Sequence, residues 1–291
     1  MPNPRPTDPR GPGVDLVVVL ITGCRSGIGL FTAVEAARRG HRVYGGLRDL
    51  DTAQDLIDAS KGLDVIPLQL DVTKAAERKL AIEQILAQEG RLDALVNNAG
   101  VALGGFMEQI EEDEFRRLFE VNLFGVWALT KEALPAMRRQ GDAVILNVSS
   151  LSGRMALPGL GSYASAKFAL EGMTEAWRHE LKPFGIRVIT VQPGAFRTDI
   201  FGRNRNLCRN AHLSGNAYEA LTQRLDRTFD RIVKWQAGDP ANAAHTIVDL
   251  LEKRRPRFRY ALGADARIRA VILKFAPFGL VEAVLGRALR E

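Results

Sequence analysis

The chain of 291 residues is poor in cysteine and histidine and contains no long apolar run. No stretch of about 18 uncharged apolar residues occurs, so the sequence predicts no transmembrane helix. Two cysteines, Cys24 and Cys208, give neither a disulfide framework nor the spacing of a metal site, and we therefore expect a reducing, cytoplasmic location. The 4 histidines lie outside the motifs described below, and none is assigned to catalysis.

The N-terminus also lacks the apolar core of a signal peptide. Residues 1–14 are rich in proline, glycine and charge, which predicts a disordered leader. The net charge is +6, and much of the excess lies in residues 203–209 and 253–259. No basic face interleaved with aromatic residues occurs, so we expect no nucleic-acid binding. A solvated surface or a site for an anionic ligand is the expected use of these charges.

Apolar and helical segments alternate along most of the chain. Apolar, strand-like runs occupy 15–23, 41–47, 63–73, 92–100, 142–150 and 186–194, and helical patterns occupy 27–39, 52–62, 74–89, 113–139 and 162–183. Strands that alternate with helices are typical of βαβ units. The sequence therefore predicts a single α/β domain over residues 15–263, with a doubly wound parallel sheet of about seven strands and helices on both faces.

Two segments do not follow this alternation. Residues 197–237 begin basic and irregular and then become helical. They follow a strand at the edge where doubly wound sheets bind ligands, which predicts a lid over the substrate. Residues 264–291 predict an amphipathic helical extension that Pro277 breaks or kinks. We expect this extension to pack over the sheet or a partner subunit, with a peripheral contact to an anionic membrane as the alternative.

A glycine-rich turn, TGCRSGIG at residues 22–29, links the first strand to the first helix. Gly23 permits a tight turn, Gly27 lets the backbone approach a pyrophosphate, and Gly29 allows the helix to pack closely. The phosphates would meet the positive end of the helix. This placement predicts a dinucleotide-binding Rossmann fold, and a glycine-rich turn without a ligand is the alternative.

The segment SYASAKFALEG, residues 162–172, carries Tyr163 and Lys167 on one face of a helix because four residues make about one turn. An ammonium beside a phenol stabilises the phenolate and lowers the pKa of the tyrosine from about 10. A tyrosine four residues before a lysine is common by chance, so other motifs must decide whether this pair moves a proton.

Those motifs resemble the short-chain dehydrogenase/reductase family, nearest its 17β-hydroxysteroid and retinol dehydrogenase-like branch. The resemblance covers about residues 15–200 and, in outline, 238–262. It rests on TGxxxGxG at 22–29, LDVT at 70–73, NNAG at 97–100, VNLFG at 121–125, VSS at 148–150, YxxxK at 163–167 and PGAFRT at 193–198. Each motif occurs in the family's order and on the corresponding element.

The resemblance implies a catalytic set of four residues. Tyr163 would exchange a proton with the substrate, and Ser150, thirteen residues earlier, would bind the substrate oxygen. Lys167 would assist Tyr163 and hold the cofactor ribose, and Asn122 would hold a water that links Lys167 to solvent. Two alternatives stay open: Ser149 in place of Ser150, and an Asn122 that only satisfies backbone groups in the helix.

The resemblance also implies a set of cofactor-binding residues, namely Gly23, Arg25, Ser26, Gly27, Ile28, Gly29, Arg48, Asp71, Val72, Asn98, Ala99, Gly100, Tyr163, Lys167, Pro193, Gly194 and Thr198. The end of the second strand distinguishes the two nicotinamide cofactors, because an acidic residue there favours NAD. This chain has Leu47 followed by Arg48, and Arg25 lies in the glycine loop. Two guanidinium groups favour a 2′-phosphate and predict NADP(H), unless Arg48 is only a solvated surface residue.

The sequence therefore predicts an NADP(H)-dependent carbonyl reductase or alcohol dehydrogenase that acts on a ketone, aldehyde or alcohol. The apolar loop 151–162 and the resemblance favour a bulky apolar substrate such as a steroid, retinoid, polyketide or lipid-like carbonyl. The basic start of the insertion leaves a polar or anionic substrate open. The alternative is a catalytically silent NADP(H)-binding protein with a regulatory or structural role. The resemblance also implies a homodimer or homotetramer.

Overall fold

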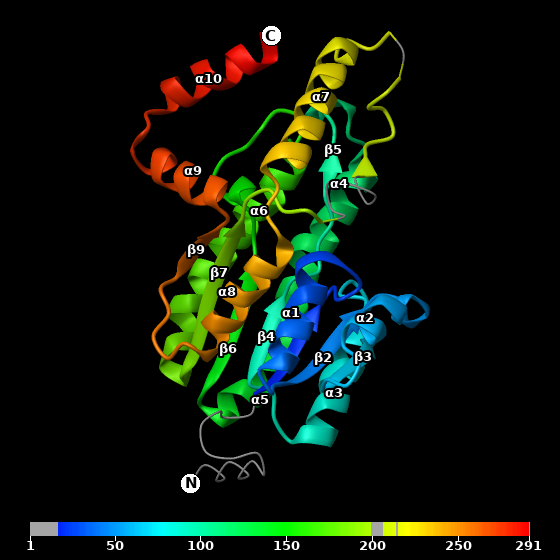
Figure 1. Ribbon diagram of the computed structural model, residues 1–291, viewed down its shortest axis with the longest axis vertical. Coiled ribbons are helices and arrows are strands. Elements are labelled where there is room, and N and C mark those ends of the chain that lie inside the picture. Colours follow the sequence, from blue (N-terminus) through cyan, green and yellow to red (C-terminus); the bar gives the residue numbers. More distant parts are fainter. Residues whose placement is uncertain (1–16, 199–205, 214, 291) are drawn as a thin grey trace.

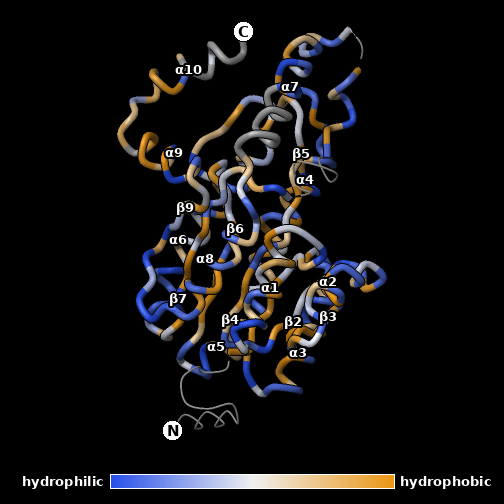
Figure 2. The backbone as a smooth tube through the Cα atoms, in the orientation of Figure 1, coloured by the Kyte–Doolittle hydropathy of each residue, from blue (hydrophilic) through white to orange (hydrophobic). Residues whose placement is uncertain are grey.

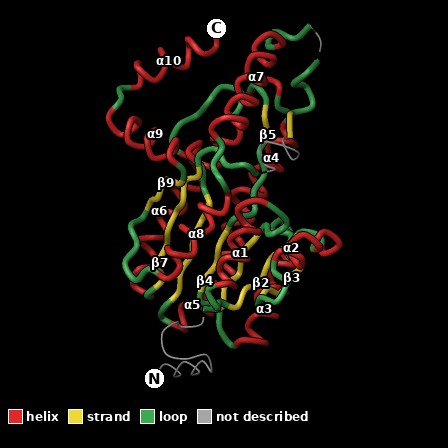
Figure 3. Tube along the Cα trace, viewed as in Figure 1, coloured by secondary structure: helices red, strands yellow, loops and turns green. Residues whose placement is uncertain are grey.

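A parallel sheet of seven strands forms the centre of the computed structural model, which describes residues 17–198, 206–213 and 215–290 (Figures 1 and 3). The predicted leader, residues 1–14, lies outside the described residues. The strands are β1 (Val18–Thr22), β2 (Arg42–Leu47), β3 (Val65–Gln69), β4 (Ala94–Asn97), β6 (Ala143–Val148), β7 (Ile186–Pro193) and β9 (Arg259–Leu262). Their order is β3-β2-β1-β4-β6-β7-β9, and neighbouring strands are parallel. The predicted α/β fold is confirmed.

Helices cover both faces of this sheet. The α-helices of the described residues are α1 (Gly27–Arg38), α2 (Gln54–Ala59), α3 (Ala75–Glu89), α4 (Glu112–Phe119), α5 (Gly125–Gln140), α6 (Gly161–Leu181), α7 (Glu219–Gln236), α8 (Pro240–Glu252), α9 (Ala264–Phe275) and α10 (Phe278–Arg290). One apolar core lies between the sheet and α1, α2 and α8, and the other lies between the sheet and α3, α5 and α6. Every residue of β1 and of β6 is buried, as their uninterrupted apolar runs predict.

The strand order indicates at which edge of the sheet a ligand would bind. β1 lies between β2 and β4, so the chain leaves β1 toward one side of the sheet and later returns to the other. Doubly wound sheets bind their ligands in the crevice outside the carboxyl ends of the strands at such a point. The loops after β1, β4, β6 and β7 all leave the sheet at this edge, because the four strands are parallel.

One helical segment departs from the sequence prediction, and one breaks where it was predicted to. The expected helix 113–139 is divided by a π-helical turn, Glu120–Phe124, between α4 and α5. Pro277 separates α9 from α10, as its missing N–H predicts. A small parallel pair, β5 (Leu103–Gly104) with β8 (Asn206–Leu207), joins the insertion to the loop after β4 and carries no pattern in the sequence.

The C-terminal helices lie at the periphery of the molecule (Figure 1). The side chains of Ile268, Val271, Ile272 and Phe275 on α9 are between half and three-quarters exposed. These four side chains are therefore not packed over the chain's own sheet, and Figure 2 shows hydrophobic stretches on α9 and the start of α10 far from the core. Packing against a partner subunit, the other half of the expectation, stays a prediction. No helix in the described ranges has the length and apolar character needed to cross a membrane.

Candidate active site

The glycine loop after β1 adopts the backbone that its sequence predicts. Gly23 and Gly27 have φ angles of 74° and 59°, in the left-handed region that favours glycine. At Gly29, a Cβ atom would lie 2.4 Å from both Asn98 Nδ2 and the Gly23 carbonyl oxygen. Glycine at this position therefore lets α1 begin directly against the loop after β4.

Thr22 ties the loops after β1 and β4 together. Its Oγ1 accepts hydrogen bonds from the backbone N–H groups of Asn98 (3.0 Å) and Ala99 (2.9 Å). In return, Asn98 Nδ2 donates to the Thr22 carbonyl at 2.9 Å. Thr22 is not among the predicted site residues, although a hydroxyl at the end of an otherwise apolar strand could have indicated its role.

A cavity of about 430 Å³ lies at this edge of the sheet. The predicted site residues that line it are Gly23, Arg25, Ser26, Gly27, Ile28, Arg48, Asn98, Ala99, Gly100, Ser150, Tyr163, Lys167, Pro193, Gly194 and Thr198. Val101, Val148, Phe196 and Asn206 line it as well and were not predicted, and Ser149, the alternative to Ser150, also lines it. One cavity thus brings together residues from the phosphate loop and from the proposed catalytic set.

Four predicted residues, Gly29, Asp71, Val72 and Asn122, are not part of this lining. Asp71 stabilises the turn after β3, where its carboxylate accepts from the Thr73 N–H (2.9 Å) and hydroxyl (2.7 Å). Contact of Asp71 and Val72 with an adenine stays a prediction. Gly29 acts through the helix packing described above.

Ser150 and Tyr163 both line the cavity and are joined by a hydrogen bond. Tyr163 is 4% exposed, and burial raises the pKa of its phenol to about 12 while a hydrogen bond with Ser150 opposes the rise. Ser150 Oγ also accepts from the Ser152 N–H at 3.1 Å. The neighbouring Ser149 Oγ has no hydrogen-bond partner among the described residues. Contact with Tyr163 therefore distinguishes Ser150 from Ser149.

Lys167 lies one helical turn beyond Tyr163 on α6. Its Nζ donates to the Val148 carbonyl at 2.9 Å and lies 5.7 Å from the centroid of the Tyr163 ring. Burial lowers the pKa of Lys167 to about 8, and the charge of Glu171 opposes this shift. Burial of the phenol therefore sets the direction of the Tyr163 pKa, and a lowering of that pKa by Lys167 stays a prediction.

Asn122 is fully buried in the π-helical turn. Its Oδ1 accepts from the Val101 N–H at 2.9 Å, and its Nδ2 donates to the Val101 carbonyl at 2.8 Å. The side chain thus satisfies both backbone groups of a residue in the loop after β4, and not groups of the helix, as the alternative reading of the sequence had it. A Cβ on Gly100 would lie 3.2 Å from Asn122 Oδ1 and 3.7 Å from Lys167 Nζ. A water path between Asn122 and Lys167 stays a prediction.

Glu171 is a buried acid that the sequence analysis missed. It lies one turn after Lys167, and its carboxylate accepts from Thr190 Oγ1 and Arg259 Nε, both at 2.9 Å. The four-residue interval from Lys167 was the available signal. Glu171 therefore links the proposed catalytic helix to β7 and β9 and places a negative charge behind Lys167.

The PGAFRT loop is supported by the start of α9. The Ala195 N–H donates to Asp265 Oδ2 at 3.2 Å, and a Cβ on Gly194 would lie 2.4 Å from that carboxylate. Thr198 lies against Gly27, where an added Cβ would be 3.3 Å away. The first turn of the predicted C-terminal extension thus supports the cavity wall.

The basic start of the insertion is partly neutralised. The Arg209 guanidinium forms an ion pair with Asp113 on α4, and the backbone N–H of Arg209 donates to Glu114 Oε1 at 3.0 Å. Asn210 Nδ2 donates to Glu111 Oε1 at 2.7 Å. Arg203, Asn204 and Arg205 lie outside the described residues. The Arg209 guanidinium is therefore already paired with a carboxylate of α4, so Arg209 is a weaker candidate for binding an anionic substrate.

The fold and the cavity together define a dinucleotide-dependent oxidoreductase of the doubly wound type. A family model described as short chain dehydrogenase matches residues 17–207. The chain belongs to the short-chain dehydrogenase/reductase family, and it acts on an alcohol or carbonyl with a nicotinamide cofactor.

Similarity to known proteins extends over most of the chain. The 3-ketodihydrosphingosine reductase of Bacteroides thetaiotaomicron is 36% identical over 249 residues, which are 84% of this chain and 87% of that protein. Human 17-beta-hydroxysteroid dehydrogenase type 1 is 34% identical over 261 residues, 84% of this chain and 76% of that protein. The crystal structure of a short-chain dehydrogenase from Streptomyces avermitilis has a TM-score of 0.77 and 35% identity, and covers 94% of this chain and 95% of its own.

Proposed function

We propose that this protein is an NADP(H)-dependent reductase of bulky apolar ketones, and a dehydrogenase of the corresponding secondary alcohols in the reverse direction. One observation carries the proposal: the glycine loop, two arginines and the Ser150–Tyr163 pair with Lys167 line the same cavity. A carbonyl held beside Tyr163 would therefore lie beside a dinucleotide held by the glycine loop.

The residues present fit a nicotinamide dinucleotide phosphate. The left-handed Gly23 and Gly27 and the N-terminus of α1 form a cradle that would hold the pyrophosphate. Arg25 and Arg48 line the cavity and would hold the 2′-phosphate, while Leu47 stands where a carboxylate would favour NAD. When bound, the cofactor supplies the hydride that the carbonyl carbon receives.

Tyr163 would supply the proton. With its pKa raised to about 12, the phenol is protonated at neutral pH and serves as the acid for reduction. The Ser150 hydroxyl would donate to the carbonyl oxygen, where negative charge develops. The Lys167 ammonium, 5.7 Å from the Tyr163 ring, would stabilise the phenolate that remains after proton transfer.

The packing behind Tyr163 is apolar and supports an apolar substrate beside the phenol. Tyr163 belongs to a buried apolar cluster with Ala102, Leu103, Leu118, Ala166, Cys208 and Ala211. Of this cluster, Tyr163 is the member that lines the catalytic cavity. The names of two relatives, a 3-ketodihydrosphingosine reductase and a 17-beta-hydroxysteroid dehydrogenase, support a substrate with a large apolar body.

The variant Tyr163→Phe tests this function. Turnover of apolar ketones with NADPH should fall by about 10²-fold or more, because the acid is lost. NADPH affinity, measured by fluorescence titration, should stay within about 2-fold because the phenol is not a phosphate ligand. Lys167→Met should reduce both quantities. A Tyr163→Phe enzyme with wild-type turnover contradicts the role of Tyr163. A wild-type protein that binds NADPH but turns over no member of a broad carbonyl panel contradicts the enzymatic function.

We also propose that the exposed apolar stripe of α9 contacts a surface outside the chain. Ile268, Val271, Ile272 and Phe275 are accompanied by Arg267 and Arg269, of which Arg267 is exposed. This combination suits an anionic membrane surface, while a second copy of the chain would cover only the apolar part. Homo-oligomerisation and a cytoplasmic location, peripheral to a membrane, remain part of this proposal.

A further inference from the structure

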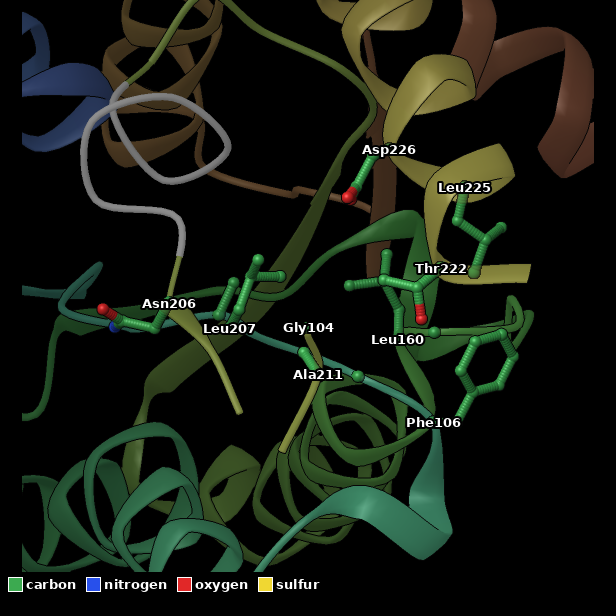
Figure 4. Close-up of a pocket in the computed structure, with 12 residues that line it drawn as sticks. Gly104, Phe106, Leu160, Asn206, Leu207, Ala211, Thr222, Leu225 and Asp226 are labelled. Carbon is green, nitrogen blue, oxygen red and sulfur yellow. The ribbon is translucent and has the colours of Figure 1, made fainter. Parts of the chain in front are cut away.

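A second, smaller cavity lies beside the proposed catalytic cavity. Its volume is about 30 Å³, which holds the end of a ligand but not its whole body. Its walls come from the loop after β4, the loop before α6, β8 and α7 (Figure 4). Asn206 lines both cavities, so they adjoin at that residue.

Most of this wall is apolar, and glycines bring its parts together. Leu160, Leu207 and Leu225 contribute the larger apolar side chains. A Cβ on Gly159 would lie 2.7 Å from Leu225 Cδ1, and one on Gly104 would lie 2.8 Å from Leu207 Cδ2. Side chains at these two positions would collide with α7 and β8 unless those elements moved.

Two polar side chains from α7 interrupt the apolar wall. Thr222 and Asp226 are separated by one helical turn, and both line the cavity. Figure 4 shows them on the α7 side, opposite Gly104 and Ala211, with the Asp226 carboxylate directed toward the side where Asn206 and Leu207 lie. Asp226 Oδ2 lies 4.0 Å from His212 Nε2, and its side chain is 27% exposed.

The Thr222 hydroxyl is buried without a hydrogen-bond partner among the described residues. The residue is 8% exposed. Two other buried helical threonines, Thr32 and Thr174, donate to the carbonyl four residues earlier, at 2.7 and 2.6 Å. Thr222 makes no such bond, although its backbone N–H does donate to the Tyr218 carbonyl. A buried hydroxyl without a partner costs free energy, so a ligand group that bonds to it would be stabilised.

We propose that this cavity is a distal subsite for a hydroxyl group at the far end of the substrate. The ligand hydroxyl would donate to the Asp226 carboxylate and accept from the Thr222 hydroxyl. The apolar body would extend from Tyr163 in the catalytic cavity toward the subsite past Asn206, the residue that lines both cavities. The inference rests on the proposed function and narrows its substrate class to ketones with an apolar body and a distal hydroxyl.

A matched substrate series tests the subsite. Linear 2-ketones of increasing length are compared with the same ketones carrying a terminal hydroxyl, in the presence of NADPH. When the chain is long enough for its end to reach the subsite, kcat/KM of the wild-type enzyme should be about 10-fold higher for the hydroxylated ketone than for the plain ketone of the same length. Thr222→Val keeps the side-chain shape and should remove most of this preference, while turnover of the plain ketones is unchanged or increased. Asp226→Asn should also reduce the preference.

The control is Thr246→Val on α8, which removes a hydroxyl that donates to the Asn242 carbonyl away from both cavities. This variant should keep the wild-type preference, and circular dichroism verifies that all variants are folded. Equal kcat/KM for both members at every length overturns the subsite but leaves the proposed function intact. A preference that Thr222→Val and Asp226→Asn do not change also overturns it. If the wild-type enzyme reduces neither series, the proposed function and the subsite fail together.

Discussion

Burial of the Lys167 ammonium costs the folded state free energy whenever that group is charged. Its pKa falls from 10.5 to about 8, and burial is the largest cause. In the unfolded chain the same group titrates near 10.5. Between pH 8 and pH 10.5 the unfolded state therefore binds more protons than the folded state. Under that condition stability rises with pH, so the contribution of Lys167 becomes less unfavourable as the solution becomes more basic.

The size of this effect follows from the shift. A pKa unit corresponds to about 1.4 kcal/mol, so the full contribution is about 3 kcal/mol. Roughly 2 to 3 kcal/mol of it should be recovered between pH 7 and pH 10, the remainder lying at higher pH. Lys167→Met removes the charge and keeps a side chain of similar length. The unfolding free energy of the wild-type protein, relative to that of Lys167→Met, should therefore increase by this amount over the interval.

Urea unfolding of both proteins without cofactor, followed by circular dichroism at several pH values, measures the difference. Other groups titrate in both proteins, and their contributions cancel in the comparison. Lys61→Met, which removes a charge from an exposed lysine, is the matched control and should show no comparable change. A wild-type minus Lys167→Met difference that stays constant from pH 7 to pH 10, or that decreases, refutes the reasoning.

Two further predictions concern the cofactor and the C-terminal helices. Arg48→Asp should lower the ratio of kcat/KM for NADPH over NADH by about 10-fold or more, because a charge-assisted hydrogen bond is replaced by repulsion. The exposed Arg38→Asp is the control for the change of charge. A ratio unchanged in Arg48→Asp excludes Arg48 as the selector. The full-length chain should sediment with anionic vesicles and less with neutral ones, and replacement of Ile272 and Phe275 by glutamine should abolish this binding by removing exposed apolar surface. The full chain is needed because Asp265 supports the PGAFRT loop, and absence of sedimentation by the wild-type protein rejects the membrane contact.

The parts of the site that depend on local backbone geometry could be predicted from sequence. Gly23 and Gly27 occupy left-handed conformations, and Gly29 leaves no room for a side chain. The spacing of a glycine pattern after an apolar strand reflects those local requirements. Likewise, the four residues between Tyr163 and Lys167 place both on the same face of α6, and both line the cavity.

Features that depend on distant partners could not be read in the same way. The π-helical turn at Glu120–Phe124 depends on the contact between Asn122 and Val101, which is 21 residues away in the chain and lies on another element. The β5–β8 pair joins residues about a hundred positions apart through two residues on each side. The Thr222 hydroxyl, which has no hydrogen-bond partner among the described residues, can be recognised as such only when the residues around it have been placed.

The proposed proton donor shows why residue spacing does not determine a pKa. Spacing alone suggested that Lys167 lowers the pKa of Tyr163, but the pKa of a buried group depends on the whole surrounding volume. Here burial raises the pKa of the phenol and lowers that of the ammonium, so each group is displaced toward its neutral form. Glu171 opposes the shift at Lys167 from the side of β7 and β9. The charge that would stabilise a Tyr163 phenolate therefore depends on a carboxylate fixed by Thr190 and Arg259, both distant in sequence from the YxxxK motif.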